Sequence, residues 1–284
     1  MSHKTTFAPG GNSESFGSRA FPRDLPSYLS EHGLDGIEIE CGRGVRISRA
    51  TYDNLPSLAA ENGIYVSLHA PYYISLSSES ADTRLASVGY ILESARAANA
   101  LGAEKIVVHS GSCAKMTREQ ALSLATDTLQ KAQAALDSEN LGHIIMCPET
   151  MGKINQLGTL DEVLAICGAP GLSRTLPCVD FGHLYARTLG GIRTKDDFTE
   201  IFDKTEQALG LERAQRMHIH FSQIMYTAGG EKKHVTFADN EYVLDYRPMC
   251  ELLKERGYTA SVVCESAGTQ AEDAAVMKRY YDGL

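Results

Sequence analysis

Histidine and carboxylate residues close a series of short apolar runs along the chain. These residues are His69, His109, Glu149, Asp180, the His218/His220 pair and Glu265. Divalent zinc and manganese accept imidazole nitrogen and carboxylate oxygen, usually with an open position for water. Any one of these residues is more simply explained as a hydrogen-bonded or solvated side chain. Together they favour a metal site, because burying several carboxylates in one place is costly unless cations neutralise them.

The apolar runs predict the strands that must position these side chains. We expect strands at residues 3–8, 36–40, 64–70, 105–109, 143–149, 176–180, 217–221 and 259–265. Most of them are too uniformly apolar to alternate between core and solvent, which is typical of parallel strands covered by helices. The segments between them have a helical period, as in Leu122, Ala125, Leu129, Ala132 and Leu136.

Eight alternating strand and helix units predict an α/β fold, a single (β/α)₈ TIM barrel formed by residues 1–284. A doubly wound sheet is the structural alternative. Only a closed barrel would bring the residues at the strand ends to one mouth, the C-terminal face where such barrels carry their active sites. The candidate metal ligands therefore favour the barrel.

The composition is that of a globular protein, with 43% hydrophobic and 22% charged residues. No apolar run reaches about 18 residues and no apolar leader follows Met1, so we expect no membrane span and a cytoplasmic location. Seven cysteines without a C-x-x-C pair indicate core residues in a reducing compartment, notably Cys147, Cys178 and Cys264. The net charge of −9 disfavours nucleic acid as a partner. Ions bound in a cleft would reverse the local field, however, so the charge leaves the partner open.

Several motifs resemble, in the same order, those of endonuclease IV, the family of zinc-dependent apurinic/apyrimidinic (AP) endonucleases. They are His69-Ala70-Pro71-Tyr72-Tyr73, Val107-Val108-His109-Ser110-Gly111-Ser112, Glu149-Thr150-Met151-Gly152-Lys153, Asp180-Phe181-Gly182-His183, Met217-His218-Ile219 and Glu265-Ser266. The resemblance covers nearly the whole chain, and the combination is specific although each motif alone is weak. It implies a (β/α)₈ barrel, in agreement with the strand pattern, and a hydrolase that acts in DNA repair.

The resemblance also implies which residues bind metal. The implied ligand sets are His69, His109 and Glu149 for one ion; Glu149, Asp180, His218 and Glu265 for a second; and His183 with His234 for a third. Glu149 would be the catalytic residue that bridges the first two ions. The implied cofactor is Zn²⁺, two or three ions, with Mn²⁺ as the alternative.

The implied partner is double-stranded DNA that contains abasic sites, bound by a monomer. Tyr72 and Tyr73 stand where the family has residues of a DNA-penetrating loop, and Arg43 or Arg46 would play a similar part. The implied reaction is cleavage of the phosphodiester 5′ to the abasic site, which leaves a 3′-hydroxyl and a 5′-deoxyribose phosphate. Paired metal ions would provide the hydroxide for it.

The chain departs from the family at two places. The family continues its Met-His-apolar motif with Asn-Asp, whereas this chain has His220-Phe221. His220 points to the same side of the strand as the motif's histidine and stays an alternate ligand. The family's third ion also takes an aspartate two residues before the last histidine, and that position is Lys232 here. Glu231 could reach the site if the loop is rearranged, so two-metal and three-metal centres both stay open.

Two other functions compete with the nuclease. A single-metal sugar isomerase or epimerase of the same barrel superfamily would need only Glu149, Asp180, His218 and Glu265. A metal-bound module that binds nucleic acid without cleaving it has Lys232 as its one support. Outside the ligand set, we expect Glu38 to form a salt bridge inside the barrel.

Overall fold

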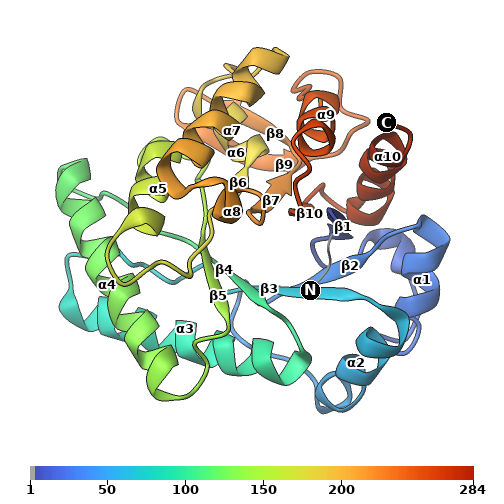
Figure 1. Cartoon of the computed structure of the whole chain (residues 1–284), viewed down its shortest axis with the longest axis horizontal. Helices are drawn as coiled ribbons and strands as arrows, with labels where there is room; N and C mark the ends of the chain where they lie inside the picture. The colour runs from blue at the N-terminus through green and yellow to red at the C-terminus, as the bar shows by residue number, and fades with distance from the viewer. Residues whose placement is uncertain (1–3) are drawn as a thin grey trace.

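Parallel strands form a ring at the centre of the chain, and helices surround it (Figure 1). The computed structural model describes residues 4–284. The strands of the ring are β1 (Thr6–Pro9), β2 (Gly36–Glu40), β3 (Tyr65–His69), β4 (Lys105–Val108), β5 (Ile145–Pro148), β6 (Cys178–Asp180), β7 (His218–Phe221) and β10 (Ser261–Cys264). Each overlaps a predicted strand. His3, the start of the first predicted strand, lies outside the described residues.

The ring is closed. Its strands form two parallel sheets in the orders β1-β10-β7-β6 and β2-β3-β4-β5. A bridge between Gly10 and Glu38 joins the first strand to the second, and a bridge between Glu149 and Cys178 joins the fifth to the sixth. A doubly wound sheet would leave two open edges, so the closure confirms the predicted (β/α)₈ barrel.

The helices follow the strands and cover the outside of the ring (Figure 1). They are η1 (Glu14–Phe16), α1 (Leu25–His32), α2 (Arg49–Asn62), α3 (Ala81–Leu101), α4 (Arg118–Ser138), α5 (Leu160–Gly168), α6 (Phe181–Arg187), α7 (Lys195–Leu209), α8 (Leu211–Ala214), α9 (Arg247–Glu255) and α10 (Gln270–Asp282). Helix α4 shows why such segments are helical. Thr117 and Gln120 form a capping box at its start. The apolar face of the helix, which includes Ala125 and Leu129, is buried against the barrel.

An antiparallel hairpin, β8 (Gln223–Thr227) and β9 (Gly230–Val235), follows β7 and was not predicted. Its residues bridge to the loop after β5, where Lys153 pairs with Gly230. The hairpin therefore packs over the C-terminal mouth of the barrel, beside the loop that begins at Glu149.

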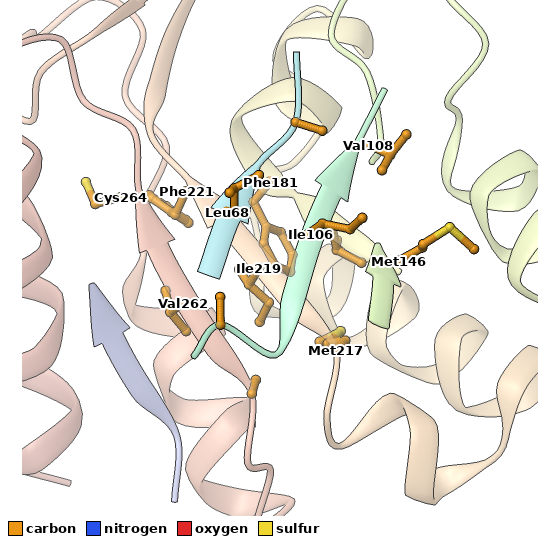
Figure 2. Packing of buried hydrophobic residues seen from close by; sticks show 14 of the residues in the cluster. Leu68, Ile106, Val108, Met146, Phe181, Met217, Ile219, Phe221, Val262 and Cys264 are labelled. Atoms are coloured by element: carbon orange, nitrogen blue, oxygen red, sulfur yellow. The ribbon is translucent and has the colours of Figure 1, made fainter. Parts of the chain in front are cut away.

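Side chains alternate between the two faces of the barrel wall along each strand. The outer positions form the large apolar cluster beneath the helices (Figure 2), with Leu68, Ile106, Met146, Ile219 and Val262 among its members. Inside the ring there is a small apolar group of Val107, Cys147, Leu176 and Cys178. Many other inner positions carry buried polar residues, among them Glu38, Ser67, His69, Lys105, Asp180, His218, His220 and Ser261. The expectation of uniformly apolar strands is thus wrong for the inner face.

All seven cysteines are free and buried, as predicted for core residues. Within residues 4–284, no helix combines the length and the apolarity that crossing a bilayer requires.

Candidate metal centre

The first ligand group lies where β3, β4 and β5 end. Nε2 of His69 and Nε2 of His109 lie 3.5 and 3.0 Å from Oε2 of Glu149. The Nδ1 of His69 donates a hydrogen bond of 2.8 Å to the carbonyl of Ala70, so Nε2 is the ring atom that faces Glu149 and would bind an ion. The two imidazole rings are nearly perpendicular, with centroids 5.0 Å apart. The three side chains therefore point their ligand atoms at one position.

The second group consists of Glu149, Asp180, His220 and Glu265, whose ligand atoms lie within 4.8 Å of one another. Nδ1 of His220 lies 3.0 Å from Oε1 of Glu149 and 3.4 Å from Oε2 of Glu265. Asp180 ends β6 and caps α6, since its Oδ1 accepts a 2.7 Å hydrogen bond from the amide of His183. The other carboxylate oxygen of Asp180, Oδ2, could therefore bind an ion. Glu149 belongs to both groups and offers one carboxylate oxygen to each.

The third group joins His183, Glu231 and His234. Nε2 of His183 lies 3.5 Å from Oε2 of Glu231. Nδ1 of His183 donates to the carbonyl of Thr150 at 2.9 Å, and Nδ1 of His234 shares a 2.9 Å hydrogen bond with the hydroxyl of Ser222. These bonds hold both rings with Nε2 toward Glu231, as metal-binding histidines are usually held.

A bulge in the hairpin places Glu231 in this group. Ile224 pairs with His234 and Met225 with Lys233, but Tyr226 pairs with Glu231, so Lys232 has no partner in the register. In a regular strand, residues three apart point to opposite faces. The extra residue at the bulge interrupts this alternation. Glu231 and His234 therefore face the same side, and Lys232 is exposed.

His218 and His220 lie at different depths in the barrel. The sequence pattern placed His218 in the second ligand set, with His220 as its alternate. In the structure His220 lies among Glu149, Asp180 and Glu265, whereas Nε2 of His218 lies 2.9 Å from Oε2 of Glu38, one layer deeper. Burial lowers the pKa of His218 to about 4, so its ring is neutral at pH 7. The geometry therefore favours His220 for the ligand position.

The donor set and its spacing fit divalent ions. Two nitrogen or oxygen ligands of a tetrahedral zinc ion lie about 3.3 Å apart. The separations from histidine nitrogen to carboxylate oxygen are 3.0 Å for His109–Glu149 and His220–Glu149, 3.4 Å for His220–Glu265, and 3.5 Å for His69–Glu149 and His183–Glu231. In addition, Oε2 of Glu149 and Oδ2 of Asp180 are buried and have no aligned hydrogen-bond partner within residues 4–284. Leaving such atoms unpaired is costly, and a bound cation would satisfy them.

The acidic and basic groups of the centre hold one another in charged forms. Burial alone would raise the pKa of Glu149, but the charge of His220 and hydrogen bonds from neighbouring imidazoles hold it well below its usual range. His220 likewise outweighs burial at Glu265 and lowers its pKa to about 2. Burial would lower the pKa of His69, yet the hydrogen bond with Glu149 and nearby carboxylates raise it to about 10. Burial raises the pKa of Asp180 to about 6. A cation would replace these imidazole protons.

An open cleft leads from the centre to the protein surface. Tyr72, His234 and Glu265 line both its inner and its outer part, and Arg43 and Arg46 line the outer part. The ring of Tyr72 stacks on that of His109 at a centroid distance of 5.3 Å, and its hydroxyl donates to Glu40 at 3.2 Å. The expected DNA-binding residues Tyr72, Arg43 and Arg46 thus lie together beside the ligand groups.

Tyr73 does not line this cleft; its ring packs against Tyr90 at 4.8 Å. Two residues that were not expected from the sequence, Lys153 and Gln156, line the inner part of the cleft. Both lie in the loop after β5, a few residues beyond Glu149. Their closeness in sequence to a predicted ligand could have indicated that they line the site.

The chain belongs to the xylose isomerase-like TIM barrel family, whose sequence model matches residues 26–280. The uncharacterized protein MJ0133 of Methanocaldococcus jannaschii is 32% identical over 252 residues, 89% of this chain and 89% of that protein. The probable endonuclease 4 of Acholeplasma laidlawii is 28% identical over 173 residues, 59% of this chain and 57% of the relative's own length. The predicted resemblance to endonuclease IV is thereby confirmed.

Solved structures share the fold. Endonuclease IV from Thermus thermophilus superposes with a TM-score of 0.69 at 17% identity, covering 98% of this chain and 100% of that one. A D-tagatose 3-epimerase-like protein superposes with a TM-score of 0.68 at 19% identity, covering 98% of this chain and 97% of that one. At these identities the likeness concerns the fold alone, which nucleases and epimerases both use.

Proposed function

We propose that this chain is a metal-dependent endodeoxyribonuclease that acts as a monomer. Its substrate is double-stranded DNA with abasic sites, and it cleaves the phosphodiester 5′ to the site. The observation that carries the proposal is the presence of three ligand groups at one barrel mouth, two of which share Glu149. A single-metal enzyme needs only one of them. The relatives named probable endonuclease 4 support the same function.

The proposed ligands are those that the geometry brings together. They are His69, His109 and Glu149; Glu149, Asp180, His220 and Glu265; and His183, Glu231 and His234. Zinc or manganese would suit these donors. Divalent ions held there would supply a water of lowered pKa and would balance the charge of the attacking and leaving oxygens at phosphorus.

The protein's own part is to fix these groups and to receive the DNA. Glu149 sets the spacing of the first two groups, because its carboxylate reaches both. Arg43 and Arg46 bring positive charge to the outer cleft, where it can contact phosphates. Tyr72 lies at the junction of the outer cleft and the centre, where its ring can fill the space of a missing base. An abasic nucleotide has no base stack to break, so its extrusion costs little.

A nicking assay tests the proposal. The zinc-loaded protein and its Glu149→Gln variant are incubated with a duplex that contains one abasic analogue. We expect cleavage 5′ to the lesion by the wild type and a rate lower by at least about 10³ for the variant, since removal of one essential catalytic group costs roughly 10⁴–10⁶ in rate. Glu212→Gln, an exposed position on α8, is the matched control. Equal cleavage by Glu149→Gln, or none by the wild type, contradicts the proposal.

A single-metal sugar epimerase is the second candidate. Glu149, Asp180, His220 and Glu265 alone would hold one ion, and the D-tagatose 3-epimerase-like protein has the same fold. Metal content separates the two candidates. One ion per chain with turnover of a ketose and no nicking favours the epimerase, whereas two or three ions favour the nuclease. Tight binding of abasic DNA without nicking would instead indicate a binding module.

A further inference from the structure

The loop after β5 forms part of the cleft wall, and a side chain outside the cleft holds its backbone. Lys153 and Gln156 extend from this loop and line the inner part of the cleft, beside the ligand groups. Arg187 is the last residue of α6, and its half-buried side chain contacts the backbone of the same loop. Within residues 4–284, the cleft lining does not include Arg187, so its effect on a bound substrate must pass through the loop.

The guanidinium of Arg187 donates hydrogen bonds to four backbone carbonyls of the loop. Its Nη1 donates to the carbonyls of Met151 and Lys153 at 2.9 and 2.7 Å. Its Nη2 donates to those of Ile154 and Gln156 at 3.2 and 2.9 Å. Hydrogen bonds from a charged donor are about twice as strong as those between neutral groups. A loop that turned away would also leave a half-buried charge without these acceptors, which is costly.

A second arginine braces the same loop. Arg118, at the start of α4, donates to the carbonyls of Ile154 and Gln156 at 3.2 and 3.0 Å. It is held in turn by Glu162, whose carboxylate accepts hydrogen bonds of 2.6 and 2.7 Å from Nε and Nη2 of Arg118. Glu162 also accepts a 2.8 Å hydrogen bond from the amide of Gly158, just beyond the loop. Two helices of the barrel wall, α4 and α6, therefore hold one loop.

We propose that Arg187 is a positioning residue for the substrate. It holds the loop of residues 151–156 in the conformation in which Lys153 and Gln156 line the cleft. The DNA then meets a wall that is already ordered, and binding does not have to order it first. The inference rests on the proposed function and deepens it, because it gives the end of α6 a part in substrate binding.

A purely structural role is the alternative explanation, and Arg213 provides the comparison. This arginine is also half-buried, and its Nη2 donates to the carbonyls of Cys167, Leu172 and Thr175 at 2.8, 3.3 and 2.5 Å. These residues lie in the connection from α5 to the start of β6, away from the end of the barrel that carries the ligand groups. An arginine that only ties a loop to the fold should affect stability, but not the binding of substrate.

The test compares Arg187→Met, Arg187→Lys and Arg213→Met with the wild type, all loaded with zinc. The readouts are hydrogen–deuterium exchange of the amides in residues 151–157, the free energy of unfolding, and KM and kcat for nicking of a duplex with one abasic analogue. If the loop without Arg187 keeps its present conformation about a tenth of the time, the apparent affinity for the duplex falls about ten-fold.

For Arg187→Met we expect faster exchange in the loop and a KM raised by about that factor, with kcat close to that of the wild type. A rise in KM alone is the effect of losing an interaction made equally in the ground state and the transition state. Arg187→Lys keeps the charge but presents one nitrogen in place of the planar fork, so its KM should lie between the two. Arg213→Met should lose stability and keep the wild-type KM.

The outcomes separate this role from the proposed function. A wild type that does not nick the duplex overturns the proposed function, and the role of Arg187 with it. A wild type that nicks, with the same KM in Arg187→Met, overturns the positioning role alone. An equal rise of KM in Arg213→Met also overturns it, because general destabilisation would then explain the effect. Unchanged loop exchange in Arg187→Met would contradict the proposal independently of activity.

Discussion

Gly152 offers a direct perturbation of the third ligand group. It follows β5, and its carbonyl accepts a 3.0 Å hydrogen bond from the amide of Glu231. A Cβ at this position would lie 2.6 Å from Cβ and 2.9 Å from Oε2 of Glu231, and 2.9 Å from Cδ2 of His183. Gly152→Ala therefore inserts a methyl group between two of the three proposed ligands.

The expected effect follows from these distances. Non-bonded carbon atoms rest about 3.5–4.0 Å apart, so Glu231 and His183 must move apart by roughly 1 Å. Overpacking of this kind costs about 1–3 kcal/mol of stability. Zinc ligands tolerate only about 0.2 Å of displacement, so the third ion should be lost. The three nearest atoms to this Cβ all belong to the third group, so the ions of the first two groups should remain.

The assay is zinc content after equilibrium dialysis, together with the free energy of unfolding from urea titration. Gly89→Ala is the matched control, because no other atom of the described part of the chain lies within 4 Å of a Cβ at that position in α3. It should keep all its zinc and gain about 0.5–1 kcal/mol of stability, as alanine does over glycine in a helix. A Gly152→Ala protein with the wild-type zinc content and stability would refute the convergence of Glu231 and His183.

Further predictions concern the ligands, the pH and the cleft. His220→Ala should lose one zinc ion and the nicking activity, whereas His218→Ala should keep the number of ions, as counted by mass spectrometry; the opposite result would restore His218 as the ligand. Zinc binding should release protons and tighten between pH 6 and pH 8, because the ion competes with protons on His69, whose pKa is about 10. Calorimetry in buffers with different ionisation enthalpies measures this release, and its absence would contradict the ligand assignment. Tyr72→Ala should weaken binding to abasic DNA by about 1–3 kcal/mol without changing the zinc content, since a stacking ring is lost. Tyr73→Ala, outside the cleft lining, should weaken it less in the same gel-shift titration, and an equal loss would argue against the cleft as the DNA site.

The barrel could be predicted from the sequence because its signal is repeated. Each barrel strand carries apolar residues on its outer face and is followed by a helical segment, so errors at individual boundaries do not change the fold. The β8–β9 hairpin was missed because β9 has four polar residues in a row, Glu231 to His234, and therefore no apolar run that would mark it as a strand. The Gly229-Gly230 pair near its turn was the available signal.

The site was harder to predict than the fold. The alternation of side chains along a strand shows which face a residue lies on, but not how deep in the barrel it lies. His218 and His220 are two residues apart and point to the same side, so a pattern cannot say which of them reaches Glu149. That choice depends on the register of β7 against β6, in which His220 pairs with Asp180. The role of Glu231 as a ligand stayed open, because it depends on a bulge at Lys232. The residue types around Lys232 do not predict that bulge.

The central claim is that three groups at the barrel mouth bind separate ions. A crystal structure of the zinc-loaded protein, with anomalous scattering measured at the zinc edge, tests it most directly. We expect three peaks, one in each group of ligands that Glu149, Asp180 and Glu231 help to form. A single peak between Glu149, Asp180, His220 and Glu265, with Glu231 turned away from His183, would contradict the claim.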